Sequence, residues 1–328
     1  MRILITHDDY TNKNYGEWFA QRLRDAAGID RFGVHELCFD ADQADAILIV
    51  ERGDIHYRDL CAHPLLKSHF AKCFVYDVQD WPIPYLPGLY ASLPANSYRA
   101  AHHRAIDYLA PINNEIAKVA AEPAPDPDLL CSFVGGPTHR VRRQLFAGVP
   151  FGASPEVVIR RKEGWSFRDE MAKHVDVFQD YARLIRRSHF ALCPRGIGTS
   201  SYRLFEAMEL GRAPVILADA WVAPVGPPWE RFSIRAPETE LGQLPGLLRA
   251  NLSRAAEMGR EARHAWEEWF GPGAKFHRMA EWLSQVSRYP GSEAAIRRVT
   301  WRKMAATAWI QFKGRRLRRL FAKLAGRH

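Results

Sequence analysis

The segment from 188 to 220 constrains the fold of this chain more than any other part of it. An apolar run is followed by a loop with two glycines and three hydroxyl side chains, then by a helix expected to begin near Tyr202 and to end at Gly211, then by a second apolar run. Ser200 or Ser201 is the expected N-cap. This order predicts an α/β sheet in which the loop and the helix N-terminus lie at the carboxyl ends of the strands, where phosphate binds favourably.

Charged side chains in and after this loop favour a diphosphate ligand. Arg195 lies in the loop with Gly196 and Gly198, and Arg203 and Glu206 are three residues apart on the helix, so both can point toward the loop. Cations suit a diphosphate, and a carboxylate suits the hydroxyls of a ribose. The alternative interpretation is an ordinary exposed ion pair, which would contribute only a fraction of a kcal/mol.

An ordered set of motif residues runs through the same segment. They are Ser188, Phe190, Leu192, Pro194, Gly196, Ser201, Arg203, Glu206, Ala207, Gly211, Pro214, Val215, Ile216 and Asp219. The set resembles the motifs of the exostosin family of glycosyltransferases, family 47 in the classification of sugar transferases. The stretches 131–146 and 229–238 resemble further family motifs, so the resemblance covers roughly residues 130 to 240.

The resemblance implies an α/β fold of the GT-B type, with two Rossmann-like lobes and a cleft between them. It also implies inverting transfer of a sugar from a nucleotide-diphosphate donor, with Glu206 on ribose or sugar hydroxyls and an upstream arginine, Arg140 or Arg143, on the diphosphate. An exposed basic helix start is the alternative for each of these two arginines. The expected donor-binding residues are Arg140, Arg143, Arg195, Gly196, Gly198, Ser200, Ser201, Arg203 and Glu206.

The rest of the chain has the length and the pattern for two such lobes. Apolar runs at 2–6, 46–50 and 73–76 alternate with helical segments and predict a parallel sheet. The proline-rich segment EPAPDPD is the expected linker. The predicted organisation is an N-terminal acceptor lobe at 1–121, a linker at 122–128, a nucleotide-sugar-binding lobe at 129–290 and a basic amphipathic tail at 291–328.

An inverting transferase needs a base that deprotonates the acceptor hydroxyl. Acidic residues and histidines after the first-lobe strands are the candidates, and Asp8, Asp9 and Asp77 are preferred over His7, Glu51, Asp54 and Asp80. Trp81 and Tyr85 lie in an aromatic, proline-rich loop and are expected to offer platforms for acceptor sugars, unless the loop packs on its own aromatics. No Asp-x-Asp motif flanked by strands is found, so we expect transfer without a metal or another cofactor, with cations stabilising the leaving diphosphate.

The tail differs from the rest of the chain in charge. Residues 297–328 hold eleven Lys or Arg and no Asp or Glu, so the remainder has a net charge of −2 within a total of +9. Trp, Phe and Leu recur among these cations at helical spacing, a composition typical of an interfacial membrane helix. Packing of the tail on the lobes is the first alternative, and binding of nucleic acid or another polyanion is the least favoured.

Other features bear on location. There is no apolar run of 18 residues, the N-terminus is expected to be a strand rather than a signal peptide, and five scattered cysteines suit a reducing compartment. The expected protein is a bacterial-type cytoplasmic enzyme on the inner face of the membrane that acts on a surface polysaccharide or a lipid-linked glycan. The alternatives are an inactive GT-B module that binds glycan or nucleotide at a membrane, and a polyanion-binding protein that uses its tail.

Overall fold

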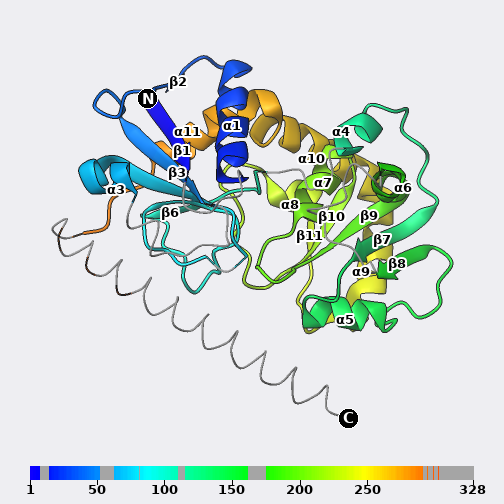
Figure 1. Cartoon of the computed structure of the whole chain (residues 1–328). Helices are drawn as coiled ribbons and strands as arrows, with labels where there is room; N and C mark the ends of the chain where they lie inside the picture. The colour runs from blue at the N-terminus through cyan, green and yellow to red at the C-terminus, as the bar shows by residue number, and fades with distance from the viewer. Residues whose placement is uncertain are drawn as a thin grey trace, which may run out of the picture.

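The computed structural model describes residues 1–7, 15–51, 63–80, 82–109, 115–161 and 175–290, and also Ala294, Arg298 and Arg302. Within these residues the chain forms two sheets, each flanked by helices (Figure 1). All strand pairs in both sheets are parallel. Two Rossmann-like lobes of this kind are the arrangement expected of a GT-B fold.

The first sheet has the strand order β2-β1-β3-β4-β5-β6. Its strands are β1 (Arg2–His7), β2 (Glu36–Leu37), β3 (Ala46–Glu51), β4 (Cys73–Asp77), β5 (Gly88–Tyr90) and β6 (His103–Ala105). Helix α1 (Tyr15–Gly28), the short helix α3 (Pro64–Ser68) and the 3₁₀ turn η1 (Phe70–Lys72) connect them. The three predicted strands are confirmed, and each extends one residue further than expected.

The second sheet has the order β11-β10-β9-β7-β8. Its strands are β7 (Leu129–Gly135), β8 (Val157–Arg161), β9 (Ser188–Pro194), β10 (Ala213–Leu217) and β11 (Ile234–Arg235). The helical elements are α4 (Glu115–Ala120), α5 (Arg140–Phe146), α6 (Val175–Arg186), α7 (Tyr202–Glu209), α8 (Trp229–Phe232), η3 (Leu241–Gln243), α9 (Leu244–Asn251), η4 (Leu252–Arg254), α10 (Ala255–Trp269) and α11 (Pro272–Ser284).

The strand-loop-helix-strand unit predicted from 188 to 220 is present. Helix α7 has Ser201 as its N-cap residue. Gly211 follows its carboxyl end with a φ of 68°, the left-handed conformation that glycine adopts without a steric penalty. Strand β9 precedes this helix in the sequence and β10 follows it, and the two strands pair in parallel. The loop after β9 therefore lies at the carboxyl edge of the sheet.

The lobes exchange helices, which the predicted domain boundaries did not include. Helix α4 lies within the predicted first lobe by sequence but packs against α6 and α7. The side-chain amide of Gln179 donates to Glu115, and the guanidinium of Arg186 donates to the carbonyl of Val119. The proline-rich segment that follows is also held on the second lobe, where Arg212 donates to the carbonyl of Pro125.

Helix α11 crosses in the opposite direction. It lies within the range predicted for the second lobe but packs along α1 (Figure 1). The segment 285–290 continues over the first lobe, where the backbone N–H of Ser287 donates to the carbonyl of Ala101 and the Tyr289 hydroxyl donates to the carbonyl of Pro84. Each lobe is therefore completed by a helix from the other half of the sequence.

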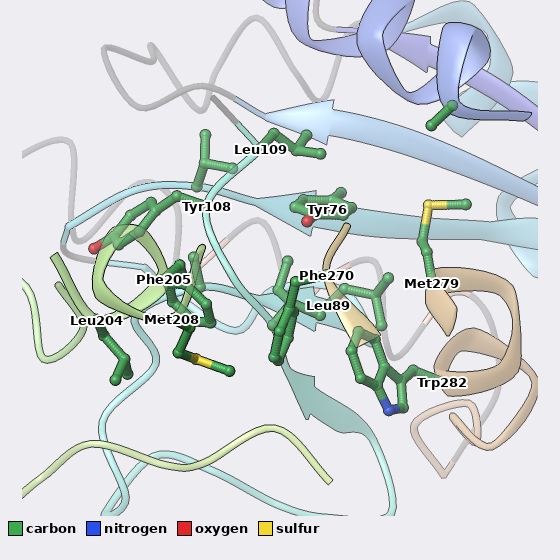
Figure 2. Packing of buried hydrophobic residues seen from close by; sticks show 14 of the residues in the cluster. Tyr76, Leu89, Tyr108, Leu109, Leu204, Phe205, Met208, Phe270, Met279 and Trp282 are labelled. Carbon is green, nitrogen blue, oxygen red and sulfur yellow. The ribbon is translucent and has the colours of Figure 1, made fainter. Parts of the chain in front are cut away.

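A single hydrophobic cluster joins the two lobes at their contact. Figure 2 shows Tyr76 and Leu89 of the first sheet and Phe205 of α7 gathered around Phe270, with Trp282 of α11 beside them. Tyr108 reaches the same cluster from the segment after β6. Burial of side chains of this size contributes about 1.5–3 kcal/mol each, so the inner faces of both lobes are stabilised by their contact.

Candidate functional site

The carboxyl ends of β7, β9, β10 and β11 lie at one edge of the second sheet, and helices α5 and α7 begin there. His139 is the N-cap residue of α5 and its ring accepts a hydrogen bond from the backbone N–H of Val141. Because the strands are parallel, the loop from Arg195 to Ser201 and the loop from Gly136 to His139 meet at this edge. The predicted location of the loop after β9, at the carboxyl ends of the strands, is thus confirmed.

Arg142 is the most enclosed cation at this edge, with only 6% of its surface exposed. Its Nε donates to the carbonyl of Arg195 at 2.8 Å, and its Nη2 donates to the carbonyl of Pro194 at 3.0 Å. The guanidinium lies over the ring of Phe133, with 5.5 Å between them. Burial, together with the nearby charge of Arg203, lowers the pKa of Arg142 to about 9. This residue fixes the carboxyl end of β9 and the start of the glycine loop.

Arg140 and Arg143, the two arginines predicted to hold a diphosphate, are exposed on the same helix. Nη1 of Arg143 donates to the carbonyl of Pro137 at 3.4 Å. Arg142, which lies between them in the sequence, is buried instead. Val141 and Leu145 form the apolar face of α5, and Arg142 lies next to that face. Helical spacing from those two apolar residues is the sequence signal that identifies Arg142.

Arg203 and Glu206 both lie against the sheet, so the alternative of an ordinary exposed ion pair does not apply. Nε of Arg203 donates to the carbonyl of Val134 at 2.6 Å, and its guanidinium faces the rings of Phe133 and Tyr181 at 5.3 and 5.9 Å. Glu206 is buried, and it accepts a hydrogen bond of 2.5 Å from the hydroxyl of Tyr181. Burial raises the pKa of Glu206, while Arg203 and the Tyr181 hydroxyl act in the opposite direction.

The two glycines of the loop allow different residues to approach the backbone closely. A Cβ at Gly196 would lie 3.2 Å from Nη2 of Arg142, so this glycine lets the arginine approach the loop. A Cβ at Gly198 would lie 2.2 Å from Oγ of Ser92 and 2.9 Å from the carbonyl oxygen of Asp80, both in the first lobe. The second half of the loop is joined to the first lobe, because the backbone N–H of Ser200 donates to Oγ of Ser92 at 3.1 Å.

Several buried polar atoms at this edge lack a protein partner among the described residues. They are Oγ of Ser200, Oγ of Ser201 and Nε of Arg195. The two serines are 4% and 6% exposed, and both lie at the N-terminus of α7. A buried polar group without a partner costs about 1–3 kcal/mol, so such groups in a native fold call for a water or a ligand. Together with the partial positive charge of the helix end, they favour an anionic ligand.

Glu238 and Asp219 join the ends of β11 and β10. The backbone N–H of Asp219 donates to Glu238, and the backbone N–H of Glu238 donates to Asp219, both at 3.0 Å. The carboxylate of Glu238 also lies 4.0 Å from Arg195 and 3.8 Å from the ring of His139. Burial and the nearby cation of Arg195 lower the pKa of His139, while Glu238 acts in the opposite direction. Glu238 is a second acidic residue of the site; it ends the motif stretch 229–238 but was not among the expected donor-binding residues.

Two of the first-lobe residues predicted as the base or as acceptor platforms, Asp77 and Tyr85, are buried. Asp77 ends β4 and is fully buried, and its Oδ1 accepts the backbone N–H of Gln79 at 2.8 Å. Tyr85 is also fully buried, and its hydroxyl donates to Glu51 at 2.5 Å, so its ring belongs to the lobe core and presents no open face to an acceptor. Asp8, Asp9 and Trp81 lie outside the described residues.

Asp80 lies at the contact between the lobes. It keeps an exposed surface, and its carboxylate accepts the Tyr108 hydroxyl at 3.3 Å and faces the backbone N–H of Gly198. Partial desolvation raises the pKa of Asp80, while Tyr108, Gly198 and the charge of Arg142 oppose that shift. The ring of Tyr108 stacks on that of Tyr202, the first residue of α7, with 3.9 Å between centroids.

The described ranges hold no group of three or more His, Cys, Asp or Glu side chains arranged to bind a metal ion. Within the same ranges, every helix is too short or too polar to cross a bilayer.

The family model of the Exostosin GT47 domain matches residues 65–251, just over half of the chain. The match extends well beyond 130–240 and includes the second half of the first lobe. Thus Asp77, Asp80 and Ser92 fall within it, as do the site residues of the second lobe from Phe133 to Glu238. The motif residues quoted from the sequence lie inside the same range.

Curated relatives agree with this match. Exostosin-1 of Drosophila melanogaster is 35% identical over 149 residues, which cover 42% of this chain and 19% of that protein. Exostosin-2 of Homo sapiens is 29% identical over 182 residues, which cover 53% of this chain and 25% of that protein. The aligned part thus spans about a fifth to a quarter of these relatives. Among solved structures, Anabaena HepE in complex with UDP is 12% identical, with a TM-score of 0.37 over 87% of this chain and 100% of that chain, too distant to inform on the site.

Proposed function

Because the chain belongs to the Exostosin GT47 family, we propose that it is a glycosyltransferase that transfers a sugar from a nucleotide-diphosphate donor to a glycan acceptor. The observation that carries this proposal is the meeting of three arginines at the carboxyl edge of the second sheet. Arg142 and Arg195 donate to carbonyls of the loop before α7, and Arg203, in the first turn of α7, donates to the carbonyl of Val134 at the end of β7. Ligands of open α/β sheets bind at this edge, and three cations beside a helix N-terminus suit a diphosphate.

The donor would lie with its diphosphate over the loop. The unpartnered hydroxyls of Ser200 and Ser201 and the Nε of Arg195 are the groups that a phosphate oxygen would satisfy. Arg142 and Arg203 already donate to backbone carbonyls, so they arrive at the ligand in fixed positions, and less conformational entropy is lost on binding. Glu206, held by Tyr181, would accept ribose or sugar hydroxyls.

Transfer would invert the anomeric centre and would need no metal ion. Breaking the bond between the sugar and the diphosphate places negative charge on the leaving group, and preorganised cations stabilise such charge in the transition state. Arg142, Arg195 and Arg203 are the residues that would supply this stabilisation here, with the N-terminus of α7.

We further propose that the acceptor is a surface polysaccharide or a lipid-linked glycan, and that the cations of 297–328 hold a cytoplasmic enzyme on the inner membrane face. Each cation near an anionic leaflet contributes about 1 kcal/mol. Changing Arg315, Arg316, Arg318 and Arg319 together to Glu in the full chain should abolish sedimentation with vesicles containing phosphatidylglycerol. Unchanged sedimentation would contradict the membrane role.

Calorimetry with UDP, GDP, ADP and dTDP tests the donor site directly. We expect one of them to bind wild-type protein, and Glu206→Gln to weaken that binding at least tenfold. Glu257→Gln, on an exposed position of α10, is the matched control and should bind like wild type. Binding of none of the four would contradict the proposed function. Binding without release of the nucleotide from any matching nucleotide sugar would favour an inactive binding module.

A further inference from the structure

We propose that Asp80 is the general base that takes the proton from the acceptor hydroxyl, an assignment that rests on the proposed function. Asp80 is a first-lobe carboxylate that touches the donor loop: the loop packs on its backbone at Gly198, and the Gly198 N–H faces its side chain. A base in the acceptor lobe must lie near the sugar carbon of a donor that is bound to the other lobe. Such a residue has to lie where the two lobes are in contact.

The other carboxylates that follow β3, β4 and β6 in the described part of the first lobe are occupied inside it. Glu51 is fully buried and accepts from Tyr85 and from the side chain of Gln79. Asp77 is fully buried and accepts a backbone N–H. Asp107 is buried and pairs with Lys275 of α11. Asp80 keeps an exposed surface and so can meet a substrate hydroxyl.

The surroundings of Asp80 fix its position relative to the donor loop. Its carboxylate accepts from the Tyr108 hydroxyl, and Tyr108 stacks on Tyr202 at the start of α7. Ser92, on the same side of the contact, accepts the N–H of Ser200 and receives a hydrogen bond from Thr199 on its carbonyl. Asp80 is therefore held beside the helix end over which the diphosphate would lie.

The proposed transfer step accounts for each bond, proton and electron pair with the groups named above. The acceptor oxygen forms a bond to the anomeric carbon as the bond from that carbon to the diphosphate oxygen breaks. The acceptor proton moves to the carboxylate of Asp80, and the bonding electron pair leaves with the diphosphate, whose charge the arginines neutralise. The neutral Asp80 then returns its proton to solvent when the products leave.

The charged and titratable groups that act on Asp80 are Tyr108 from its own lobe and Arg142 from α5 of the other lobe. Desolvation has the largest effect and raises the pKa of Asp80, which moves a carboxylate toward the range where a general base is effective near neutral pH. Turnover should therefore fall on the acid side as Asp80 becomes protonated.

The test uses the full chain and the variants Asp80→Asn and Asp80→Glu, with Asp42→Asn as an exposed first-lobe control. The nucleoside diphosphate that binds wild type is titrated into each variant, and its release from the matching nucleotide sugar is followed with an oligosaccharide panel as acceptors. Asp80→Asn should lower turnover about 10²–10⁴-fold, with the diphosphate Kd changed less than threefold. Asp80→Glu should recover part of the turnover.

Two results would overturn this assignment while leaving the proposed function intact. One is a folded Asp80→Asn variant that keeps at least a tenth of wild-type turnover. The other, which does not depend on any variant folding, is a wild-type turnover rate that does not decline between pH 7 and pH 4.5 while the protein stays folded. Absence of both nucleotide binding and transfer in wild type would overturn the proposed function, and the assignment with it.

Discussion

The hydroxyl of Tyr181 donates a hydrogen bond of 2.5 Å to the buried carboxylate of Glu206, and so connects α6 with α7 beneath the donor loop. Tyr181→Phe removes this donor and leaves a buried carboxyl group short of a partner, so the free energy of unfolding should fall by about 1–3 kcal/mol. The pKa of Glu206 should rise further, because the hydroxyl lowers it.

Urea unfolding and nucleotide titration of Tyr181→Phe check this prediction. Nucleotide affinity should fall along with stability, since the hydroxyl positions Glu206. Tyr98→Phe, in the segment between β5 and β6 of the first lobe, is the control. A Tyr181→Phe protein with wild-type stability and affinity would show that the hydrogen bond has no role in either.

Arg142→Lys should be far more damaging than the same change at Arg140. The guanidinium of Arg142 donates to two carbonyls that a single ammonium cannot reach with the same geometry, whereas Arg140 is exposed. We expect the free energy of unfolding to fall by about 1.5–3 kcal/mol and nucleotide binding to weaken at least tenfold. Similar effects in the two variants would exclude the assigned role of Arg142.

Gly198→Ala tests the contact between the lobes. The added Cβ would fall within 3.0 Å of Ser92 and of the backbone of Asp80, so atoms of the contact must move. Overpacking of this kind costs about 1–3 kcal/mol, which thermal unfolding will detect. Gly242→Ala is the matched control, because a Cβ there meets nothing within 4 Å. Equal melting temperatures for the two variants would contradict the close approach at Gly198.

Glu209 provides a pH-dependent prediction. Burial raises the pKa of Glu209 to about 7, above its ordinary value of 4.5. Below pH 4.5 the carboxyl group is protonated in both states and costs nothing. As pH rises to 7, the unfolded state releases its proton first, so stability falls, and above pH 7 the loss is constant.

Glu209→Gln should therefore stabilise the protein by about 1–3 kcal/mol at pH 8 and by much less at pH 5. Denaturant unfolding at the two pH values measures the difference, with Glu257→Gln as the exposed control. An equal effect of Glu209→Gln at both pH values would show that the carboxyl group is not desolvated in the folded state.

Local patterns in the sequence predicted the strands and the glycine loop, because each depends on neighbours within about twenty residues. The apolar runs of β3 and β9 and the glycine after α7 are examples. Contacts between distant segments could not be read in this way. Nothing near Gly198 in the sequence indicates that Ser92 and Asp80 pack against it, and nothing in the segment after β6 indicates that α4 packs on α6.

The difference between local patterns and long-range contacts also explains which site residues the sequence predicted. The residues of the loop and of α7 lie together at the sheet edge because one short segment carries them, and their role in donor binding stays a prediction. Arg142 was passed over in favour of its exposed neighbours, although its spacing from Val141 and Leu145 places it beside the apolar face of α5. Tyr181 and Glu238 reach the site from α6 and from the end of β11, and no spacing rule connects them to the loop.

The exchange of α4 and α11 means that neither lobe is a continuous piece of sequence. A gene divided at the proline-rich segment would yield two fragments, each with a helix whose packing surface lies on the other. Such fragments should behave as complementing halves that fold on meeting, and not as independent units. Exchange of one lobe for that of another family member, by recombination or by design, would need two junctions, one between Leu109 and Glu115 and one near Gly271.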